Sequence, residues 1–315
     1  MPELPEVTTT AKKLNQILPK QKILDVWTSY NSKYFKGKGN IKDPKYFKYF
    51  KKAIIGRKIQ NVDRIGKNVL INIDGPKTIL VHMKMTGHLL YGDYKKVGRG
   101  KKHSDQGEWQ ATTVGPLQDK FNGYIRFIMR LGGTKRAGPK YLALSDVRKF
   151  AKVTLIEDGK VDNFADTKKL GPDPLGKNFD FDVFKKIILS KPAGRIKNVL
   201  MDQELIAGIG NIYSDEALWW SGIHPETAVK KLKDTELKSL LKNIKKVLNL
   251  GIDFGGDSAS DYRQPDGRPG RFQLRHMVYR RKGQKCPKKD CGGTIIRKVV
   301  GGRSAHFCDT HQKKK

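Results

Sequence analysis

The chain of 315 residues is long enough for about two domains, and 37% of its residues are hydrophobic, enough for globular cores. Lysine and arginine total 64 against 31 aspartate and glutamate residues, so the formal net charge is +33. Self-repulsion of that size opposes compaction, so a polyanionic partner is expected, with nucleic acid as the first candidate. No run of 18 apolar residues occurs, which excludes a transmembrane helix, and the acidic, proline-containing start is unlike a signal peptide. An intracellular protein is expected.

Apolar periodicity predicts a helix and then a series of strands in the N-terminal half. A helix is expected where apolar residues recur every three to four positions, at Leu4, Val7, Ala11, Leu14 and Leu18. Strands are expected where apolar residues alternate or cluster between turns, over residues 69–73, 79–85, 124–131 and 141–144. This order of strands and turns favours an antiparallel sandwich over a parallel sheet. Residues 95–103 hold five basic residues in nine, which indicates either a mobile loop or a merely solvated excursion.

The second half of the chain has the pattern of a helical domain. Residues 170–175 contain two prolines and a glycine, and a rigid linker or turn is expected there. A helix capped by Asp182 is expected to reach Leu189. A second helix, with a continuous apolar stripe, is expected to begin at Asp234 and to stop at Gly251.

Three cysteines and a histidine near the C-terminus have the spacing of a metal site. Cys286, Cys291, Cys308 and His311 form C-x4-C-x16-C-x2-H, two close pairs of soft ligands joined by a strand–turn–strand linker. An odd, clustered set of cysteines does not fit a secreted disulfide framework. One zinc ion is expected, and because it would have four protein ligands it would be structural. The alternative is three unrelated thiols in a disordered basic tail.

A glycine turn, Gly208-Ile209-Gly210, separates two helical stretches and is followed by Asn211. Backbone N–H groups at the start of the second helix, together with the helix dipole, favour an anion such as phosphate. Taken alone, the pattern favours the simpler interpretation of a tight corner between two helices.

The amino terminus carries a second pattern of chemical interest. The initiator methionine is normally removed before proline, which would leave Pro2 with a free secondary amine beside Glu3. An α-amino group has a pKa near 8, against about 10.4 for lysine, so part of it is neutral and nucleophilic at pH 7. A secondary amine can form an iminium with a sugar aldehyde carbon, and the adjacent carboxyl group can transfer protons. Taken alone, the pattern favours a proline that simply starts a helix.

In combination, these segments resemble the formamidopyrimidine-DNA glycosylase/endonuclease VIII family. The similarity runs from residue 2 to about residue 311 and is weakest over 91–140. The matching segments are residues 1–7 (MPELPEV), 64–67 (RIGK), 83–89 (MKMTGHL), 145–150 (SDVRKF), 170–175 (LGPDPL), the glycine turn ending at Asn211, and 302–308 (GRSAHFC). Each segment alone is weak evidence, but their common order makes the resemblance specific.

The resemblance implies an α+β fold. An N-terminal helix plus an antiparallel β-sandwich would be followed by a linker, a helical domain with a helix–two-turn–helix element, and a zinc hairpin. The expected boundaries are 1–155 for the catalytic β-sandwich domain, 156–178 for the linker, 179–275 for the helical domain and 276–315 for the zinc hairpin. In the family, DNA lies across the cleft between the domains.

The resemblance also implies a reaction, that of a bifunctional DNA glycosylase/AP lyase of base excision repair. Pro2 is expected to attack C1′ and form a Schiff base, Glu3 to transfer protons, and Lys67 to act as a cation and proton donor beside the phosphate; β,δ-elimination follows. The expected DNA-binding residues are Glu6, Met85, Arg148, Phe150, Asn211 and Arg303. Met85, Arg148 and Phe150 match residues that fill the space left by an extruded base. The alternative is sandwich core for Met85 and Phe150 and ordinary surface for Arg148.

The expected partner is damaged double-stranded DNA, and the count of 16 basic and 3 acidic residues over 263–315 supports it. Residues 255–272 resemble the lesion-capping region of the formamidopyrimidine branch. This favours oxidised purines (8-oxoguanine and formamidopyrimidines) over the oxidised pyrimidines of the endonuclease VIII branch. One structural zinc, no nucleotide cofactor, no membrane and a monomeric state are expected. The expected location is the cytoplasm, associated with the nucleoid, in a bacterium, and the nucleus or another DNA compartment otherwise.

Two other classes of protein compete with this interpretation. A non-catalytic damaged-DNA-binding protein can keep the scaffold, but a decayed copy need not keep both Pro2 and Glu3. A ribosomal or RNA-binding protein rests on charge alone and explains none of the spaced motifs. The chain departs from the family in its wider first zinc pair, in His311 where a cysteine is usual, and in a longer, more basic 91–140 stretch. Histidine is a competent zinc ligand, so the metal is expected to be retained.

Overall fold

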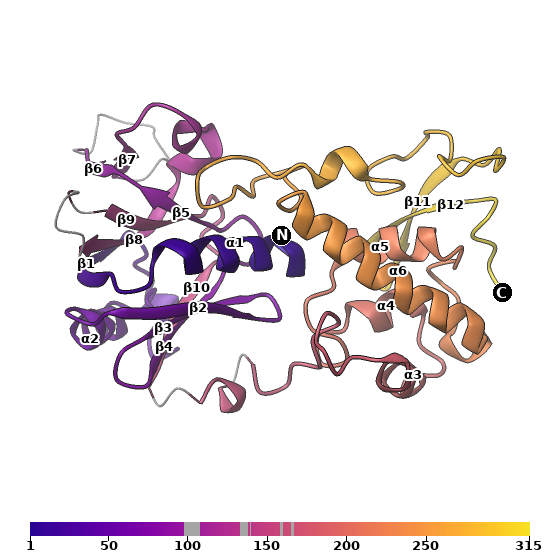
Figure 1. Ribbon diagram of the computed structural model, residues 1–315, viewed down its shortest axis with the longest axis horizontal. Coiled ribbons are helices and arrows are strands. Elements are labelled where there is room, and N and C mark those ends of the chain that lie inside the picture. The colour runs from indigo at the N-terminus through magenta and orange to yellow at the C-terminus, as the bar shows by residue number, and fades with distance from the viewer. Residues whose placement is uncertain (98–107, 133–137, 139, 158–159, 165–166) are drawn as a thin grey trace. The chain divides into compact units, whose positions relative to one another are not determined.

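The computed structural model describes residues 1–97, 108–132, 138, 140–157, 160–164 and 167–315 (Figure 1). The chain divides into two compact units. Unit 1 comprises Met1–Phe164 and Gly255–Arg271, and unit 2 comprises Ala165–Phe254 and Phe272–Lys315. Segment 255–271, which was expected to belong to the helical domain, therefore packs with the N-terminal residues. Unit 1 is built from two separate pieces of chain.

Unit 1 is an antiparallel β-sandwich, as expected. One sheet has the order β1 (Lys22–Thr28), β8 (Ile125–Gly132), β9 (Lys140–Ser145) and β5 (His88–Gly92). The other has the order β10 (Lys152–Ile156), β4 (Lys77–His82), β3 (Asn68–Ile73) and β2 (Ile59–Ile65). The apolar residues of both sheets meet in one buried core. The four strands predicted from alternation correspond to β3, β4, β8 and β9.

A two-stranded ribbon and two helices complete unit 1. The ribbon pairs β6 (Tyr94–Lys96) with β7 (Trp109–Ala111), so Lys95 and Lys96 of the basic segment lie in a strand, whereas 98–103 fall outside the described residues. Helix α1 (Leu4–Ile17) buries its predicted apolar face against β2 and β3. Helix α2 (Pro44–Ile54), which was not predicted from the sequence, begins after the capping carboxylate of Asp43 and buries Phe50 and Ile54.

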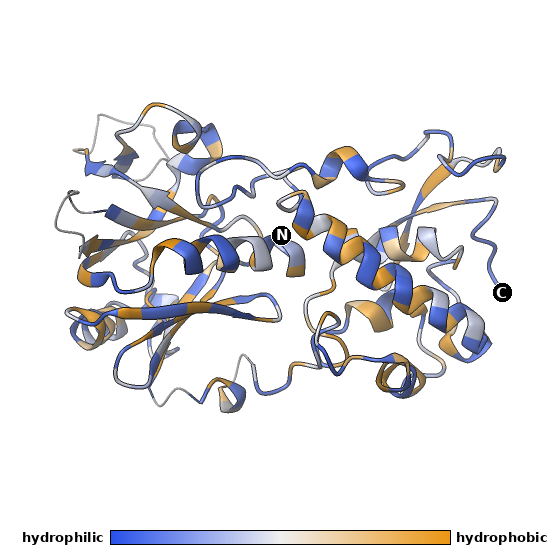
Figure 2. Ribbon diagram, in the orientation of Figure 1, coloured by the Kyte–Doolittle hydropathy of each residue, from blue (hydrophilic) through white to orange (hydrophobic). Residues whose placement is uncertain are grey.

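Unit 2 contains helices and a β-hairpin. The helices are α3 (Phe181–Leu189), α4 (Ile196–Met201), α5 (Asn211–Trp220) and α6 (Asp234–Asp253), and the hairpin pairs β11 (Ile295–Val300) with β12 (Arg303–Cys308). Helix α3 is capped by Asp180, whose side chain accepts from Val183 N, and not by Asp182 as predicted. Helix α6 shows apolar and polar stripes along its length (Figure 2). Within the described part of the chain, no helix is long and apolar enough to cross a membrane.

Short 3-10 helices connect these elements. They lie at Lys33–Phe35, Pro116–Gln118, Lys120–Gly123, Val161–Asn163, Val229–Lys231 and Phe272–Arg275.

A buried ionic network fastens the hairpin of unit 2 to its helices. Lys197 Nζ of α4 lies 2.5 Å from Asp215 Oδ1 of α5, and both side chains are fully buried. Asp215 Oδ2 accepts from the backbone N–H of His306 in β12 at 2.9 Å. Because one carboxylate serves α4 and β12 together, its loss would leave a buried charge without a counter-ion.

We therefore expect Asp215→Asn to destabilise unit 2 by about 3–5 kcal/mol, because the Lys197 ammonium would stay buried without its carboxylate. Urea denaturation measures the free energy of unfolding. The control is Asp234→Asn, which removes the partner of Lys185 in a solvent-exposed pair and should cost less than about 1 kcal/mol. Equally small losses in both variants would contradict this account.

Candidate functional site

The first turn of α1 fixes the amino terminus. Pro2 and Glu3 are buried, and Glu3 is the N-cap of α1, with its backbone N–H donating to Glu6 Oε2 at 2.7 Å. The second oxygen of the same carboxylate, Glu6 Oε1, accepts from Asp257 N at 2.7 Å. Glu6 is 1% exposed, so both contacts are shielded from water. One side chain thus ties the residues next to Pro2 to segment 255–271.

Lys67 lies at the hairpin turn between β2 and β3, after Gly66, whose φ is +53°. Its side chain is 7% exposed. Burial, followed by the charges of Lys84, Lys67 and Lys152, lowers the pKa of His82 on β4 to about 3. The imidazole is consequently neutral at pH 7, and its Nδ1 accepts from Lys84 N at 3.0 Å. These lysines form a region of positive potential that favours an anionic ligand.

One buried carboxylate, that of Asp146, organises the two turns that carry Met85 and Arg148. Asp146 Oδ1 accepts from Thr86 Oγ1 at 2.6 Å, and Oδ2 accepts from Tyr30 OH and Ala151 N, each at 2.8 Å. Thr86 Oγ1 in turn accepts from Arg148 N at 3.1 Å. Burial, then the Asp146 charge, raises the pKa of Tyr30 well above its usual value, so the phenol keeps its proton.

The side chains presented by these turns face solvent. Met85 is 37% and Phe150 48% exposed, which excludes the alternative that they belong to the sandwich core. The Arg148 guanidinium lies 4.5 Å from the centre of the Phe150 ring, in a cation–π arrangement. Lys84 and Lys149, the residues just before Met85 and Phe150, have φ of +54° and +57°, so each turn is held in an unusual backbone conformation.

A pocket of about 730 Å³ opens beside these turns in unit 1. Its lining includes five cations and, among the described residues, no carboxylate: Lys42, Lys84, Arg148, Lys149 and Lys152. Lys42 Nζ donates to the carbonyl of Lys149 at 2.7 Å and lies 4.6 Å from the centre of the Phe35 ring. Lys42 therefore helps to hold the turn that carries Arg148 and Phe150. Aromatic faces and cations together suit a nucleic-acid strand.

In unit 2, Gln203 closes the predicted glycine turn. Its Nε2 donates to the carbonyl of Ile209 at 2.7 Å, and its Oε1 accepts from Gly208 N at 2.9 Å. Gly208 has a φ of +94°, a conformation that glycine adopts more easily than other residues. The turn ends at Asn211, the first residue of α5.

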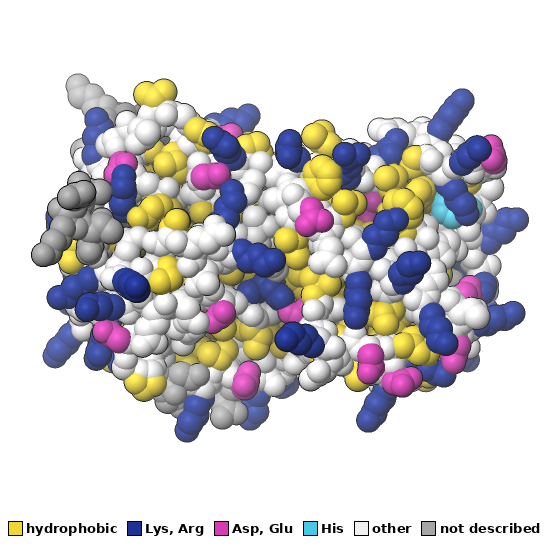
Figure 3. Space-filling view, in the orientation of Figure 1, with side chains coloured by type: hydrophobic (Ala, Val, Ile, Leu, Met, Phe, Trp, Pro, Cys, Tyr) yellow, Lys and Arg dark blue, Asp and Glu magenta, His cyan; other side chains and the backbone are white. Residues whose placement is uncertain are grey.

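The hairpin brings Arg303 to Asn211. Asn211 Nδ2 donates to Ser304 Oγ at 3.3 Å, and Arg303, the preceding residue, is exposed at the start of β12. Asn211 Oδ1 is buried and has no hydrogen-bond partner among the described residues. Two of the predicted DNA-binding residues, Asn211 and Arg303, therefore share one corner of unit 2. Figure 3 shows that Lys and Arg side chains outnumber the acidic ones, which are interspersed among them, over the visible face.

The predicted metal ligands converge. The ligand atoms of Cys286, Cys291, Cys308 and His311 all lie within 4.8 Å of one another. Cys291 Sγ is 3.5 Å from Cys308 Sγ and 3.5 Å from His311 Nδ1, close to the roughly 3.8 Å edge of a tetrahedral zinc site with 2.3 Å bonds. His311 Nε2 faces the carbonyl of Trp219 at 3.3 Å, which leaves Nδ1 for the metal. The donor set fits one structural zinc ion.

Sequence reasoning missed the residues that hold these groups in place. Asp146 stands inside the 145–150 segment that carries the family resemblance, yet no role was predicted for it. Gln203 similarly satisfies backbone groups of the glycine turn. Glu6 was predicted to bind DNA, but it is 1% exposed and its carboxylate accepts from the backbone N–H groups of Glu3 and Asp257. An acidic residue directly after a strand with a buried end, as Asp146 is after β9, was the one available signal.

Removal of zinc should unfold the hairpin and leave the β-sandwich intact, because all four ligands lie within residues 286–311. We expect one zinc per chain by elemental analysis, and rapid trypsin cleavage after residue 282 once a chelator is added. His311→Cys should keep the metal, whereas His311→Ala should lower its affinity at least tenfold. A chain that stays protease-resistant without zinc would contradict this assignment.

The low pKa of His82 predicts acid sensitivity. Its pKa of about 3 in the folded chain lies below the unfolded value of 6.5. The contribution of the neutral imidazole to the free energy of unfolding is therefore complete above pH 6.5, and it is lost as the pH falls towards 3. Relative to His82→Gln, the unmodified chain should lose up to about 1.4 kcal/mol of unfolding free energy per pH unit across this range. Parallel pH profiles of the two proteins would show that His82 does not titrate in this way.

Three family models match the chain. They are the formamidopyrimidine-DNA glycosylase N-terminal domain over residues 1–153, the formamidopyrimidine-DNA glycosylase H2TH domain over 170–263, and the zinc finger found in FPG and IleRS over 283–310. The matches follow the β-sandwich, the helices and the zinc hairpin in order.

Relatives match over the full length. The formamidopyrimidine-DNA glycosylase of Streptococcus pyogenes serotype M6 is 34% identical over 320 residues, covering 100% of both chains. The protein of the same name from Bacillus subtilis is 33% identical over 318 residues, again covering 100% of both.

Solved structures agree. A Lactococcus lactis FPG mutant in complex with a Fapy-dG containing DNA is 29% identical with a TM-score of 0.79, covering 99% of this chain and 100% of that one. The MutM (FPG) protein of Thermus thermophilus is 30% identical with a TM-score of 0.76, covering 100% of both. In sequence and in structure, along its whole length, the chain belongs to the formamidopyrimidine-DNA glycosylase family.

Proposed function

We propose that the chain is a bifunctional DNA glycosylase/AP lyase that removes oxidised purines from double-stranded DNA. Solved relatives include a Lactococcus lactis FPG bound to DNA with Fapy-dG and another bound to DNA with an abasic site. The observation that carries the proposal is the Glu6 carboxylate, which contacts Glu3 and Asp257 together. The residue that follows the proposed nucleophile and the proposed lesion-binding segment are therefore held by one side chain.

The chemistry begins at Pro2 after removal of Met1. As the Pro2 nitrogen bonds to C1′ and gives up its N–H proton, the glycosidic C1′–N bond breaks and the base leaves carrying a proton in exchange. Protonation of O4′ by Glu3 opens the deoxyribose ring and leaves an iminium between Pro2 and C1′. Loss of a C2′ proton expels the 3′ phosphate, a second elimination expels the 5′ phosphate, and water then hydrolyses the iminium and frees Pro2.

Lys67 supports these eliminations as a cation beside the phosphate and as a proton donor. Its effect on the pKa of His82, alongside those of Lys84 and Lys152, is consistent with a positively charged region on this part of unit 1. Positive potential stabilises the phosphate anions that leave in both eliminations.

The target base must leave the helical stack before Pro2 can reach C1′, at a cost of a few kcal/mol. Met85 is exposed enough to enter the vacated space, and Arg148, stacked on Phe150, can contact the unpaired base on the other strand. The Asp146 hydrogen bonds fix both turns beforehand, so little conformational entropy is lost when DNA binds.

Asn211 and Arg303 bind the DNA backbone. A guanidinium fork suits the bidentate geometry of a phosphate, and the Asn211–Ser304 hydrogen bond keeps the two residues at one corner. Cys286, Cys291, Cys308 and His311 would hold the zinc ion, which serves to order the hairpin on which Arg303 stands.

Glu3→Gln tests the division of labour. Because an abasic site needs no base expulsion, the variant should lose at least 100-fold in excision of 8-oxoguanine or a formamidopyrimidine, but much less in cleavage of a pre-formed abasic site. Gel assays on duplexes that carry each lesion measure both rates.

A retained Met1 or an N-terminal tag blocks the amine and should abolish both reactions while leaving DNA affinity within about threefold.

Other outcomes of the same lesion panel would redirect the proposal. Faster release of thymine glycol than of 8-oxoguanine would assign the chain to oxidised pyrimidines. Tight binding of every damaged duplex with no cleavage of any would make it a non-catalytic damaged-DNA-binding protein.

A further inference from the structure

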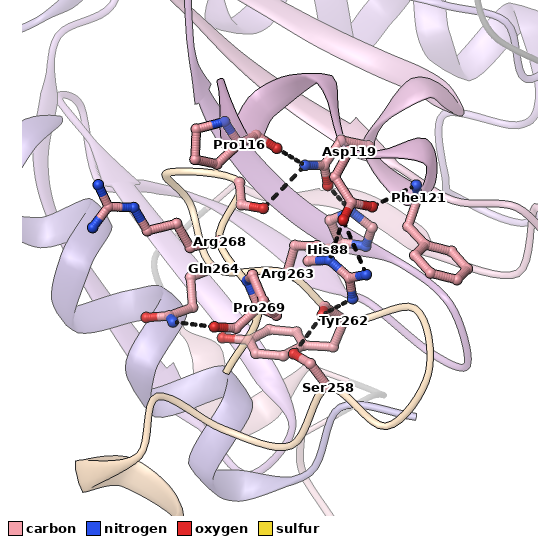
Figure 4. Close-up of polar contacts among 12 residues, drawn as sticks. His88, Pro116, Asp119, Phe121, Ser258, Tyr262, Arg263, Gln264, Arg268 and Pro269 are labelled. Atoms are coloured by element: carbon pink, nitrogen blue, oxygen red, sulfur yellow. Dashed lines mark hydrogen bonds and ion pairs between the residues drawn. The ribbon is translucent and has the colours of Figure 1, made fainter. Parts of the chain in front are cut away.

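Residues 255–271 pack against residues 109–124 of unit 1, a segment for which the sequence predicted no function. We call residues 255–271 the capping segment and residues 109–124 the inserted segment. The inserted segment lies in the 91–140 stretch, where similarity to the family is weakest. Figure 4 shows the polar contacts that join the two segments, all within unit 1.

Arg263 is the centre of this junction. Its Nε lies 3.2 Å from Asp119 Oδ2, and its guanidinium lies 4.6 Å from the centre of the Phe121 ring. On the capping segment itself, Arg263 Nη1 donates to the carbonyls of Ser260 at 3.0 Å and Tyr262 at 2.8 Å. The side chain is 8% exposed, so one desolvated cation fixes the local bend of the capping segment and its attachment.

Asn122 makes a second attachment. Its Nδ2 donates to the carbonyl of Gly267 at 3.2 Å and to that of Pro116 at 2.8 Å. Its Oδ1 lies 2.9 Å from His88 Nε2, and burial lowers the pKa of His88 to about 4, so the ring is neutral at pH 7. A Cβ at Gly267 would lie 2.6 Å from Leu117 N, so the two backbones touch.

Two residues of the capping segment are attached to α1. Asp257 N donates to Glu6 Oε1 at 2.7 Å, and Tyr262 OH donates to the carbonyl of Glu6 at 3.1 Å. Residues 258–261 lie between these two attachments and are partly exposed. Residues 258–261 thus form a short bridge, fixed on one side by Asp257 to α1 and on the other by Tyr262 to α1 and by Arg263 to the inserted segment.

We propose that Asp119, Asn122 and Arg263 are positioning residues that set the shape of residues 258–261 for binding an extruded damaged base. A bridge fixed at both ends loses less conformational entropy when it closes over a ligand than a free loop does. These three residues should therefore increase the rate of base excision alone, because an abasic site offers no base to bind. The inference rests on the proposed function and gives the inserted segment its role.

The test compares two reactions of each variant at single turnover. In Asp119→Asn and Arg263→Gln, excision of 8-oxoguanine from duplex DNA should fall about 10–100-fold, while cleavage of a pre-formed abasic site stays within about threefold. Because the two residues form one ion pair, the double variant should lose no more than the worse single variant. Arg263→Lys keeps the cation and should recover part of the excision rate.

The matched control is Asp25→Asn, which removes an exposed ion pair to Lys51 that involves no residue of the capping segment or of the inserted segment. It should leave both reactions unchanged. Equal losses of both reactions in Asp119→Asn and in Arg263→Lys would make the junction merely structural and overturn the inference, as would unchanged excision in every variant. If the unmodified chain excises no damaged base at all, the proposed function fails, and the inference with it.

Discussion

The buried carboxylate of Glu6 is the interaction on which the N-terminal unit depends. It accepts one hydrogen bond from Glu3, at the start of α1, and one from Asp257, in a piece of chain 251 residues away. A single acceptor therefore fixes the direction of the amino terminus and the position of the capping segment. Pro2 can react with a nucleotide whose base lies beneath the capping segment only if the distance between Pro2 and that segment is fixed. The two hydrogen bonds of the Glu6 carboxylate fix this distance.

Polar side chains also hold the irregular segments at the other parts of the site. Asp146 satisfies the Thr86 hydroxyl and the Ala151 N–H and so holds two turns whose tips are solvent-exposed. Gln203 does the same for the turn before Asn211. In each case a buried or half-buried polar side chain satisfies polar groups of an irregular segment, because unpaired buried groups would each cost about 1–3 kcal/mol. The neighbouring exposed residue is thereby positioned without being buried itself.

Much of this molecule could be predicted from its sequence, and the omissions have physical reasons. Period-two and period-3.6 patterns predicted the sandwich and α6, and ligand spacing predicted the zinc set, because these depend on local chemistry. The cap of α3 was placed at Asp182 because the sequence offers two aspartates, and only the backbone geometry selects Asp180. Pairings such as Asp119–Arg263 join residues 144 positions apart, and no local pattern encodes them.

The central claim is that the reactive group is the amine of residue 2. Reduction by borohydride during the reaction on abasic DNA would convert the iminium into a stable amine bond between protein and sugar. Proteolysis and mass spectrometry of this adduct then locate the attachment. The account predicts the sugar fragment on Pro2 in a chain that has lost Met1. Attachment to a lysine side chain, with Lys67 as the first suspect, would contradict it.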